Sequence, residues 1–434
     1  MQDPSPQQLA DQADDARART LILIQGLDQA QLMGPRLPIV NPLRWEIGHA
    51  AYFYEHWILR RHGGEAPGRP DVDRLYDSIS IPHDDRWALP LPELPETLDY
   101  MQGVQERVRS RLLSGQEDAR RDYLVQYAVF HEDMHTEAFT YTRQTLGYPV
   151  PAIGVAPNPA WQAGRLTGDG DAAVPGGTFW LGAREQDGFC FDNEKWAHPV
   201  EVAPFRIARA AVSNGDYAAF VDDGGYRRPE LWDPEGWAWR GQAALAHPVY
   251  WRHGPEGWEL RRFDHWGPLP LTAAVIHVNW HEARAYCRWS GRRLPTEVEW
   301  EVAAAGEPSP NGRSLAPTKR RFPWGDEPPS PERANLDGGA LGTIDVGALP
   351  AGDSAFGCRQ MIGNVWEWTD TVFGPYPGFV PDMYQDYSQP LFGSTRVLRG
   401  GGWATRGRLI RNTWRNYYGP ERNDVLAGLR TCAL

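Results

Sequence analysis

The sequence has few cysteines and no long apolar run, and these two absences exclude several classes of protein. Its four cysteines, Cys190, Cys287, Cys358 and Cys432, lie far apart and form no CxxC pair. We therefore expect neither a disulfide framework nor a cysteine-bound metal, and a reducing cytoplasm is the default location. No segment approaches the roughly 18 consecutive apolar residues that can cross a bilayer. The polar, acidic residues 1–20 do not have the pattern of a secretory signal.

The sequence also lacks the basic excess of a nucleic-acid-binding protein. Lys and Arg number 44 against 56 Asp and Glu, which gives the 434 residues a formal charge of −12. A negative chain is repelled by phosphate backbones and by anionic membrane surfaces, so we expect neither as a partner. Aromatic residues are abundant instead, with 20 Trp, 17 Tyr and 14 Phe beside 45 Gly and 38 Pro. This composition is typical of a folded chain whose irregular segments are fixed by large rings.

The apolar pattern predicts a helical domain in residues 1–150. Apolar residues at 21–24 begin one predicted helix, and further helices are predicted at 44–61, 94–113 and 123–146. With a long connection after the second helix, this pattern favours a four-helix bundle. Residues 151–174, rich in Pro, Gly, Ala and Asp, are predicted to be a linker.

Residues 175–434 predict a second domain of short strands and long loops. A turn and a strand are expected at 175–182, and short helices at 212–222, 280–290 and 296–304. The predicted fold class is therefore α+β, with a helical domain followed by one of little regular structure.

The sharpest chemical signal is the pair His131 and His135 in the fourth predicted helix. Residues four apart stand on one helix face, so their imidazoles can reach one metal ion. His49, in the second predicted helix, is a candidate third ligand, and His56 and His62 compete for that place. On ligand type alone, three neutral imidazoles fit Zn, Ni or Fe(II) about equally well.

The C-terminal domain contains a series of tight turns beside tryptophans or charged residues. We expect these turns to fix the fold rather than to carry chemistry. They lie at residues 176–182, 278–287, 293–301, 322–326, 363–369 (GNVWEWT), 397–403 (VLRGGGW) and 428–430.

This order of motifs resembles the formylglycine-generating-enzyme-like fold, a variant of the C-type lectin fold. Residues 1–150 resemble a DinB-like four-helix bundle. Together the two domains are similar to the ergothioneine-type sulfoxide synthases, which are non-haem Fe(II) enzymes. The segments 42–50 (PLRWEIGHA) and 130–135 (FHEDMH) carry the resemblance to the two-domain family.

The resemblance implies a reaction in which O2 and Fe(II) couple a thiol-bearing donor to C2 of the imidazole of hercynine, Nα-trimethylhistidine. It implies His49, His131 and His135 as the iron ligands. Where the family has Asn and an aromatic residue for the trimethylammonium group, this sequence has Asn416 and Tyr417, with Trp414 close by. Where the family tends to have Gln before the last ligand, this sequence has Met134, which cannot donate a comparable hydrogen bond.

The resemblance also implies a catalytic tyrosine in the loop after residues 363–369. Tyr376 is the residue we choose as proton or hydrogen-atom donor, and Tyr384 and Tyr387 are its rivals.

The expected donor-binding loop departs most from the family pattern. Asp77 matches the family, but Ser80 and His83 stand where members that use γ-glutamylcysteine have paired arginines. Only Arg86 remains nearby, and Asp84 and Asp85 add negative charge. A neutral, hydroxyl-rich donor suits such a loop better, and the pattern resembles the selenoneine synthase branch, which uses a selenosugar. The alternative donors are cysteine and γ-glutamylcysteine.

Three other functions are weighed against this one. A formylglycine-generating oxidase would need a cysteine pair for copper, and Thr405 stands where one of these is expected, which leaves Cys432 alone. A DinB-type thiol transferase would place Zn or Ni on the same three histidines and would work without oxygen. A lectin-like binding module would not need the histidines.

Overall fold

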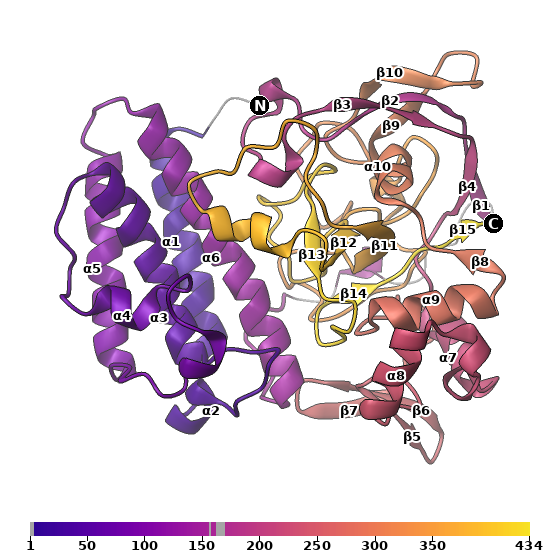
Figure 1. The fold of residues 1–434 in the computed structure, drawn as a ribbon, viewed down its shortest axis with the longest axis horizontal. Coiled ribbons are helices and arrows are strands. Elements are labelled where there is room, and N and C mark those ends of the chain that lie inside the picture. Colours follow the sequence, from indigo (N-terminus) through magenta and orange to yellow (C-terminus); the bar gives the residue numbers. More distant parts are fainter. Residues whose placement is uncertain (1–3, 156–157, 162–169) are drawn as a thin grey trace. The chain divides into compact units, whose positions relative to one another are not determined.

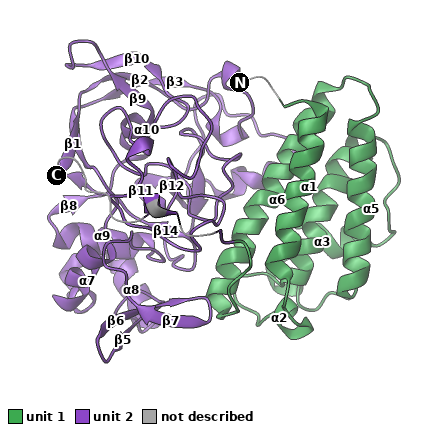
Figure 2. Cartoon of the chain, turned by 180° about the vertical axis from the view of Figure 1, so that it is seen from behind, with its two compact units in different colours: residues 1–153 green, residues 154–434 purple. Residues whose placement is uncertain are grey.

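The computed structural model describes residues 4–155, 158–161 and 170–434. The chain divides into two compact units, Met1–Ile153 (unit 1) and Gly154–Leu434 (unit 2), shown in separate colours in Figure 2. Unit 1 is helical, and unit 2 combines short helices with short strands. The prediction of an α+β chain is therefore confirmed. Among the described residues, no helix has the length and apolarity needed to cross a membrane.

Unit 1 is built around four long helices that lie side by side in Figure 1, namely α1, α3, α5 and α6. Helix α1 packs on α6, and α3 packs on both α5 and α6. The helices of the described part of this unit are α1 Pro6–Ile24, α2 Gln29–Met33, α3 Leu43–Tyr54, the π-helical η1 Glu55–His62, α4 Val72–Tyr76, the 3₁₀ helix η2 His83–Asp85, α5 Leu94–Leu112 and α6 Ala119–Leu146.

The first helix corrects the sequence prediction. The apolar residues 21–24 end α1 rather than begin a helix, because the helix starts at a capping box around Ser5. The Ser5 hydroxyl accepts from the Gln8 backbone N–H, and the Gln8 side chain accepts from the Ser5 backbone N–H. Pro6 follows at a position where a helix needs no N–H donor.

Unit 2 has several small sheets rather than one large one. The strands are β1 Asp171–Val174, β2 Gly177–Leu181, β3 His198–Val202, β4 Phe205–Ala208, β5 Trp251–Gly254, β6 Gly257–Arg262, β7 His265–Pro268, β8 Arg292–Arg293, β9 Gly306–Pro308, β10 Leu315–Lys319, β11 Trp366–Val372, β12 Arg396–Arg399, β13 Asn416–Tyr418, β14 Ala427–Gly428 and β15 Cys432–Ala433. The helices are α7 Asn214–Asp222, α8 Pro234–Gln242, α9 Trp280–Trp289 and α10 Glu297–Ala305. The predicted strand at 175–182 and the three predicted helices match β2, α7, α9 and α10.

Two four-stranded sheets organise unit 2, in the orders β1-β4-β15-β8 and β13-β12-β11-β14. All their pairings are antiparallel except β11 with β14. Strand β1 pairs with β4 although it lies inside the predicted linker 151–174. The second compact unit therefore begins earlier than the predicted residue 175.

Buried ion pairs join the turn motifs of unit 2 to one another. Arg430 contacts Glu367 at 2.9 Å, and Glu367 also accepts from the indole N–H of Trp300 at 2.7 Å. Arg415 contacts Glu297 at 2.7 Å. Because these charges are almost fully buried, losing one partner would leave a desolvated charge behind. The three motifs that contribute to these contacts, at 293–301, 363–369 and 428–430, thus have the structural role that we expect from their composition.

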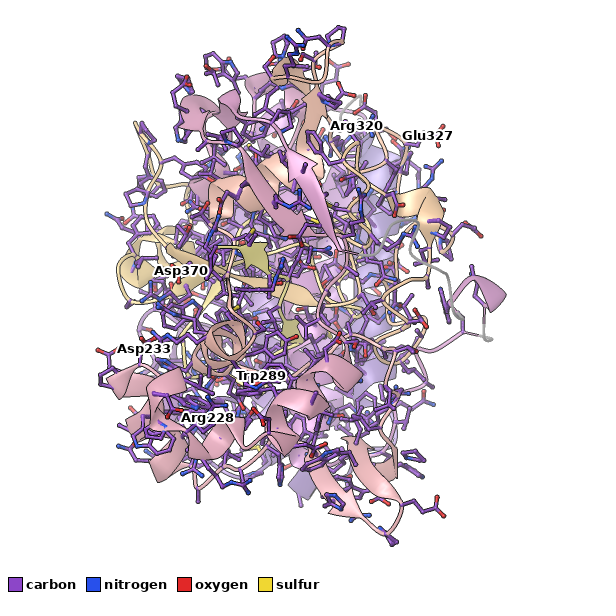
Figure 3. The ribbon with its side chains drawn as sticks, turned by 90° about the vertical axis from the view of Figure 1, so that its right-hand side faces the viewer. Arg228, Asp233, Trp289, Arg320, Glu327 and Asp370 are labelled. Atoms are coloured by element: carbon purple, nitrogen blue, oxygen red, sulfur yellow. The ribbon has the colours of Figure 1, made fainter. Side chains whose placement is uncertain are left out.

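Surface ion pairs connect α9 with the start of α8 and with β11. Asp233, just before α8, pairs with Arg288 and lies 3.4 Å from Arg284. Arg284 also lies 3.4 Å from Asp370 of β11. Asp233 and Asp370 are labelled on the face of unit 2 shown in Figure 3. Such half-exposed pairs contribute about 0–1 kcal/mol each, so they orient the elements more than they stabilise them.

Candidate metal centre

Three histidines of unit 1 converge on one point. The ring nitrogens that His49, His131 and His135 could offer to a metal lie within 4.8 Å of one another. The Nε2 atoms of His131 and His135 are 3.3 Å apart. Nitrogens bound to one ion at about 2.1 Å would be separated by about 3.0–3.4 Å, so the separation of the His131 and His135 nitrogens fits a shared metal.

Helix geometry explains this convergence. His131 and His135 are one turn apart on α6, and His49 faces them from α3, with its ring centroid 5.1 and 5.0 Å from theirs. The competing histidines lie elsewhere. His56, in the π-helical segment, contacts the Tyr52 hydroxyl and Arg61, and His62 contacts Asp118 at 2.7 Å.

A close approach of two segments orients the ring of His49. Its Nδ1 lies 2.8 Å from the backbone carbonyl of Tyr76. A carbonyl only accepts, so Nδ1 carries the hydrogen and Nε2 keeps a lone pair for a metal. The neighbouring Gly48 permits this contact, because a Cβ there would lie 2.1 Å from the Tyr76 ring.

Two histidine rings are held by aromatic neighbours. Trp45 stacks on His49 at 4.7 Å and 9°, and Phe53 stacks on His131 at 3.8 Å and 13°. Burial lowers the pKa of His49 and of His131 well below the ordinary histidine value, with the neighbouring His135 acting in the same direction. Both rings therefore stay neutral near pH 7, which is the form that binds metals.

A carboxylate that the sequence analysis did not foresee lies behind His135. Glu46 is 3% exposed, and its Oε1 is 3.7 Å from Nδ1 of His135. The sequence does contain a signal, since Glu46 is the one acidic residue of the largely apolar helix α3 and lies about one turn before His49. Metal-bound histidines usually donate their second ring N–H to such an acceptor.

The donor-binding candidates of unit 1 lie in the loop around the 3₁₀ helix His83–Asp85. The Ser80 hydroxyl donates to Asp77 at 3.0 Å. Nε2 of His83 lies 2.7 Å from the Val40 carbonyl. Arg86 donates to Asn41 at 2.7 Å, and its guanidinium lies 4.0 Å from the Trp45 ring. Arg86 is thus engaged within unit 1. The exposed pair of Asp84 with Arg36, at 2.6 Å, offsets part of the expected negative charge.

Two of the hercynine-binding candidates of unit 2, Trp414 and Tyr417, contact Tyr387. The Trp414 indole N–H lies 3.4 Å from the Tyr387 hydroxyl, and the Tyr417 hydroxyl donates to the Tyr387 carbonyl. Tyr417 also stacks on Phe373 at 3.8 Å. Asn416 is half-buried at the start of β13, where its side-chain oxygen accepts from the Tyr417 N–H. Met134, the remaining candidate, lies in unit 1 between the two histidines of α6.

Tyr376 lies apart from this aromatic group, in the main core of unit 2. Its ring is 4.1 Å from the Arg415 guanidinium and 4.8 Å from the His198 ring. Burial raises the pKa of its hydroxyl well above the usual value. This buried hydroxyl has no hydrogen-bond partner among the described residues. Its rival Tyr384 lies just before the short 3₁₀ helix that contains Tyr387.

Comparison with known proteins identifies both parts of the chain. Residues 12–139 match the DinB superfamily, and residues 159–433 match the sulfatase-modifying factor enzyme 1-like domain. The formylglycine-generating enzyme of Streptomyces coelicolor is 34% identical over 59% of this chain and 84% of its own length. Thr405, which stands where a copper-binding cysteine was expected, is buried and its hydroxyl accepts from the Gly402 N–H.

Two relatives match both units together. A hercynine oxygenase of Mycobacterium tuberculosis is 41% identical over 98% of both chains. A hercynine oxygenase of Mycolicibacterium smegmatis is 39% identical over 97% of both chains. Similarity of this extent, through both domains, shows that the chain belongs to the hercynine oxygenase family.

Proposed function

We propose that this protein is a non-haem Fe(II), O2-dependent enzyme that joins a selenium or sulfur donor to C2 of the imidazole of hercynine. The observation that carries the proposal is the convergence of His49, His131 and His135 in a chain similar throughout to hercynine oxygenases. The hydrogens on imidazole C2 and on the donor chalcogen would be lost as the new carbon–chalcogen bond forms, which releases two electrons. O2 would take these two electrons and two more from the chalcogen, so that one oxygen atom would end on the chalcogen, as a sulfoxide or selenoxide, and the other would leave as water with the two hydrogens. Bound iron would supply the site at which O2 and the donor are activated.

The three histidines would hold the iron, and their surroundings support this role. Neutral rings suit a divalent ion, and the stacked rings of Trp45 and Phe53 limit rotation of His49 and His131. His135 is the most accessible of the three, with 18% of its side chain exposed. Zn and Ni would fit the same nitrogens, so the metal itself must be tested.

Asn416, Tyr417, Trp414 and Met134 would bind hercynine. An aromatic face attracts a quaternary ammonium group by about 0.5–2 kcal/mol, and Tyr417 and Trp414 lie together around Tyr387. Met134 would contact the imidazole through its thioether, without a strong hydrogen bond.

Tyr376 would donate a proton or hydrogen atom to the reacting oxygen. Its unpartnered hydroxyl supports this role, because a buried polar group without a partner is costly and is retained at functional sites. Tyr387 is the competing candidate, since it contacts both Trp414 and Tyr417.

A selenosugar is the donor we favour, as in selenoneine biosynthesis. A γ-glutamylcysteine donor needs cations for its carboxylates, and the one arginine of the loop, Arg86, already binds Asn41 and stacks on Trp45. Asp77, Ser80 and His83 have carboxylate, hydroxyl and imidazole groups, the kinds of group that suit sugar hydroxyls. A bound sugar would replace the present contacts of Ser80 with Asp77 and of His83 with the Val40 carbonyl.

The test is anaerobic reconstitution with Fe(II), Zn(II) or Ni(II), followed by hercynine, a donor and air. We expect a new product mass only with Fe(II) and O2. A mixture of selenosugar, cysteine and γ-glutamylcysteine, resolved by mass, identifies the preferred donor. Turnover with Zn(II) in the absence of oxygen would contradict the proposal and favour a thiol transferase. Product from the thiols alone would contradict only the selenium assignment.

Substitution of a ligand gives an independent check. His131→Ala should abolish both iron retention and product, because one lost imidazole leaves too few ligands at a buried site. His62→Ala is the matched control, since His62 belongs to the same unit but pairs with Asp118. Iron retention and activity that survive His131→Ala would show the ligand assignment to be wrong.

A further inference from the structure

We propose that Glu46 is a positioning residue for the metal centre, accepting a hydrogen bond from Nδ1–H of His135 in the metal-loaded protein. Asn41 and Arg86 would hold the Glu46 carboxylate in place. This inference rests on the proposed function, because it assumes that the three histidines bind a metal.

Two hydrogen bonds connect Arg86 to Glu46, whose carboxylate lies near His135. Arg86 donates to the Asn41 side-chain oxygen at 2.7 Å, and the Asn41 amide donates to Oε1 of Glu46 at 2.8 Å. That oxygen lies 3.7 Å from Nδ1 of His135. The last separation is longer than the usual ~2.9 Å, so one of the two side chains would have to rotate for the hydrogen bond to form on metal binding.

Glu46 differs from two other buried carboxylates of the bundle, Glu132 and Glu55. Glu132 contacts Arg17 at 3.1 Å, and Glu55 contacts Arg107 at 2.8 Å. Within the part of the chain that the structure describes, no Lys or Arg side chain contacts Glu46, and its Oε2 has no hydrogen-bond partner. A buried carboxylate needs compensating positive charge. A divalent ion on the far side of His135 would supply it through the imidazole.

The carboxylate would also select the tautomer of His135. A neutral histidine carries its hydrogen on either ring nitrogen. A hydrogen on Nε2 would point toward the other ligands and block metal binding, whereas an acceptor at Nδ1 holds the hydrogen there. The same bond makes Nε2 a stronger donor to the metal.

Arg86 also contacts the aromatic ring that packs on His49. Its guanidinium lies over Trp45, and the Trp45 ring stacks on His49. One residue of the donor loop is thus in contact with the supports of two metal ligands. In this arrangement Arg86 stabilises the histidine site and is not free to bind a donor carboxylate.

The experiment measures Co(II) affinity and the Co(II) absorption spectrum of the full-length protein, without substrates. Glu46→Gln and Glu46→Leu should weaken Co(II) binding by about 10–100-fold and alter the visible bands of the bound ion. Asn41→Ala, which keeps the carboxylate, should weaken binding in the same direction to a smaller extent. Glu55→Gln is the control, since it removes a buried carboxylate that does not face the histidines.

The outcomes separate this inference from the proposed function. Wild-type affinity and spectrum in all three variants at Glu46 and Asn41 would overturn the positioning role, provided that His131→Ala still abolishes binding. Equal losses with Glu55→Gln would overturn it too, because the effect would then be one of general stability. Failure of the wild-type protein to bind Co(II) at the histidines would overturn the metal site itself.

Discussion

At the scale of single residues, the histidine site is defined by the groups behind it as much as by the ligands. The Tyr76 carbonyl fixes the tautomer of His49, and Trp45 and Phe53 fix two ring planes. Because these supports are packed in the bundle, the rings are already oriented before a metal arrives. Little side-chain freedom then remains to be lost on binding.

The tyrosines of unit 2 can be separated by single substitutions. Tyr376→Phe should slow product formation by about 100-fold or more, or divert oxygen into oxidation of the donor, because it removes only a hydroxyl that would transfer a proton. Tyr387→Phe should instead raise KM for hercynine, since it loses its contact with Trp414. Steady-state rates with product analysis measure both. Loss of coupling in Tyr387→Phe alone would move the catalytic role to Tyr387.

Part of the site could be predicted from the sequence. The spacing of His131 and His135 was informative because a helix places residues four apart on one face. The role of Glu46 could not be predicted in this way, since it depends on how α3 lies against α6. The same holds for Arg86, whose contacts with Asn41 and Trp45 join segments more than 40 residues apart in the sequence.

At the scale of elements, long periodic helices were predicted well and short or irregular elements less well. The helix predicted at 44–61 exists, but its second half, Glu55–His62, is π-helical. The apolar pattern of these eight residues did not distinguish a π-helix from an α-helix. Strand β1, Asp171–Val174, was missed because its Asp-Ala-Ala-Val sequence is weakly strand-forming and lies in a Pro- and Gly-rich stretch.

A buried capping residue of α9 should make the stability of unit 2 depend on pH. Burial raises the pKa of Glu282 to about 7 from an ordinary 4.5, although Tyr226 and the Asn279 N–H favour the charged form. The folded state therefore binds more protons than the unfolded state between these values. This contribution to stability is present below about pH 4.5 and is lost as the pH rises to about 7.

Glu282→Gln should remove this pH-dependent loss. The difference in the free energy of unfolding between the variant and the wild type should therefore shift in favour of the variant by about 1–3 kcal/mol between pH 5 and pH 8. Denaturant unfolding followed by Trp fluorescence measures it. Glu299, at the same position of α10, is the control, because Arg293 helps to lower its pKa against the effect of burial. Glu299→Gln should show no such gain. A pH-independent difference for Glu282→Gln would contradict the raised pKa.

At the scale of the whole molecule, the candidate metal ligands all belong to unit 1. Removing the metal with a chelator should therefore destabilise unit 1, by about 2.7 kcal/mol where the free metal is at 100 times its Kd. Far-UV circular dichroism follows the helices of this unit. Trp fluorescence follows mainly unit 2, because only Trp45, Trp57 and Trp87 lie in unit 1.

We expect chelation to lower the melting temperature seen by circular dichroism, and His131→Ala to be insensitive to the chelator. A change confined to the fluorescence transition would contradict a metal site in unit 1.

The confinement of the histidine triad to the first 153 residues has an evolutionary consequence. The residues assigned to the metal and those of the aromatic group around Tyr387 are encoded in separate stretches of the gene. Under the proposed function, mutations in the second stretch could change how the acceptor molecule is held while the three histidines stay unchanged. Exchange of one chalcogen source for another would be more constrained, because the loop between α4 and α5 includes Arg86, which also contacts Asn41 and Trp45 beside the histidines.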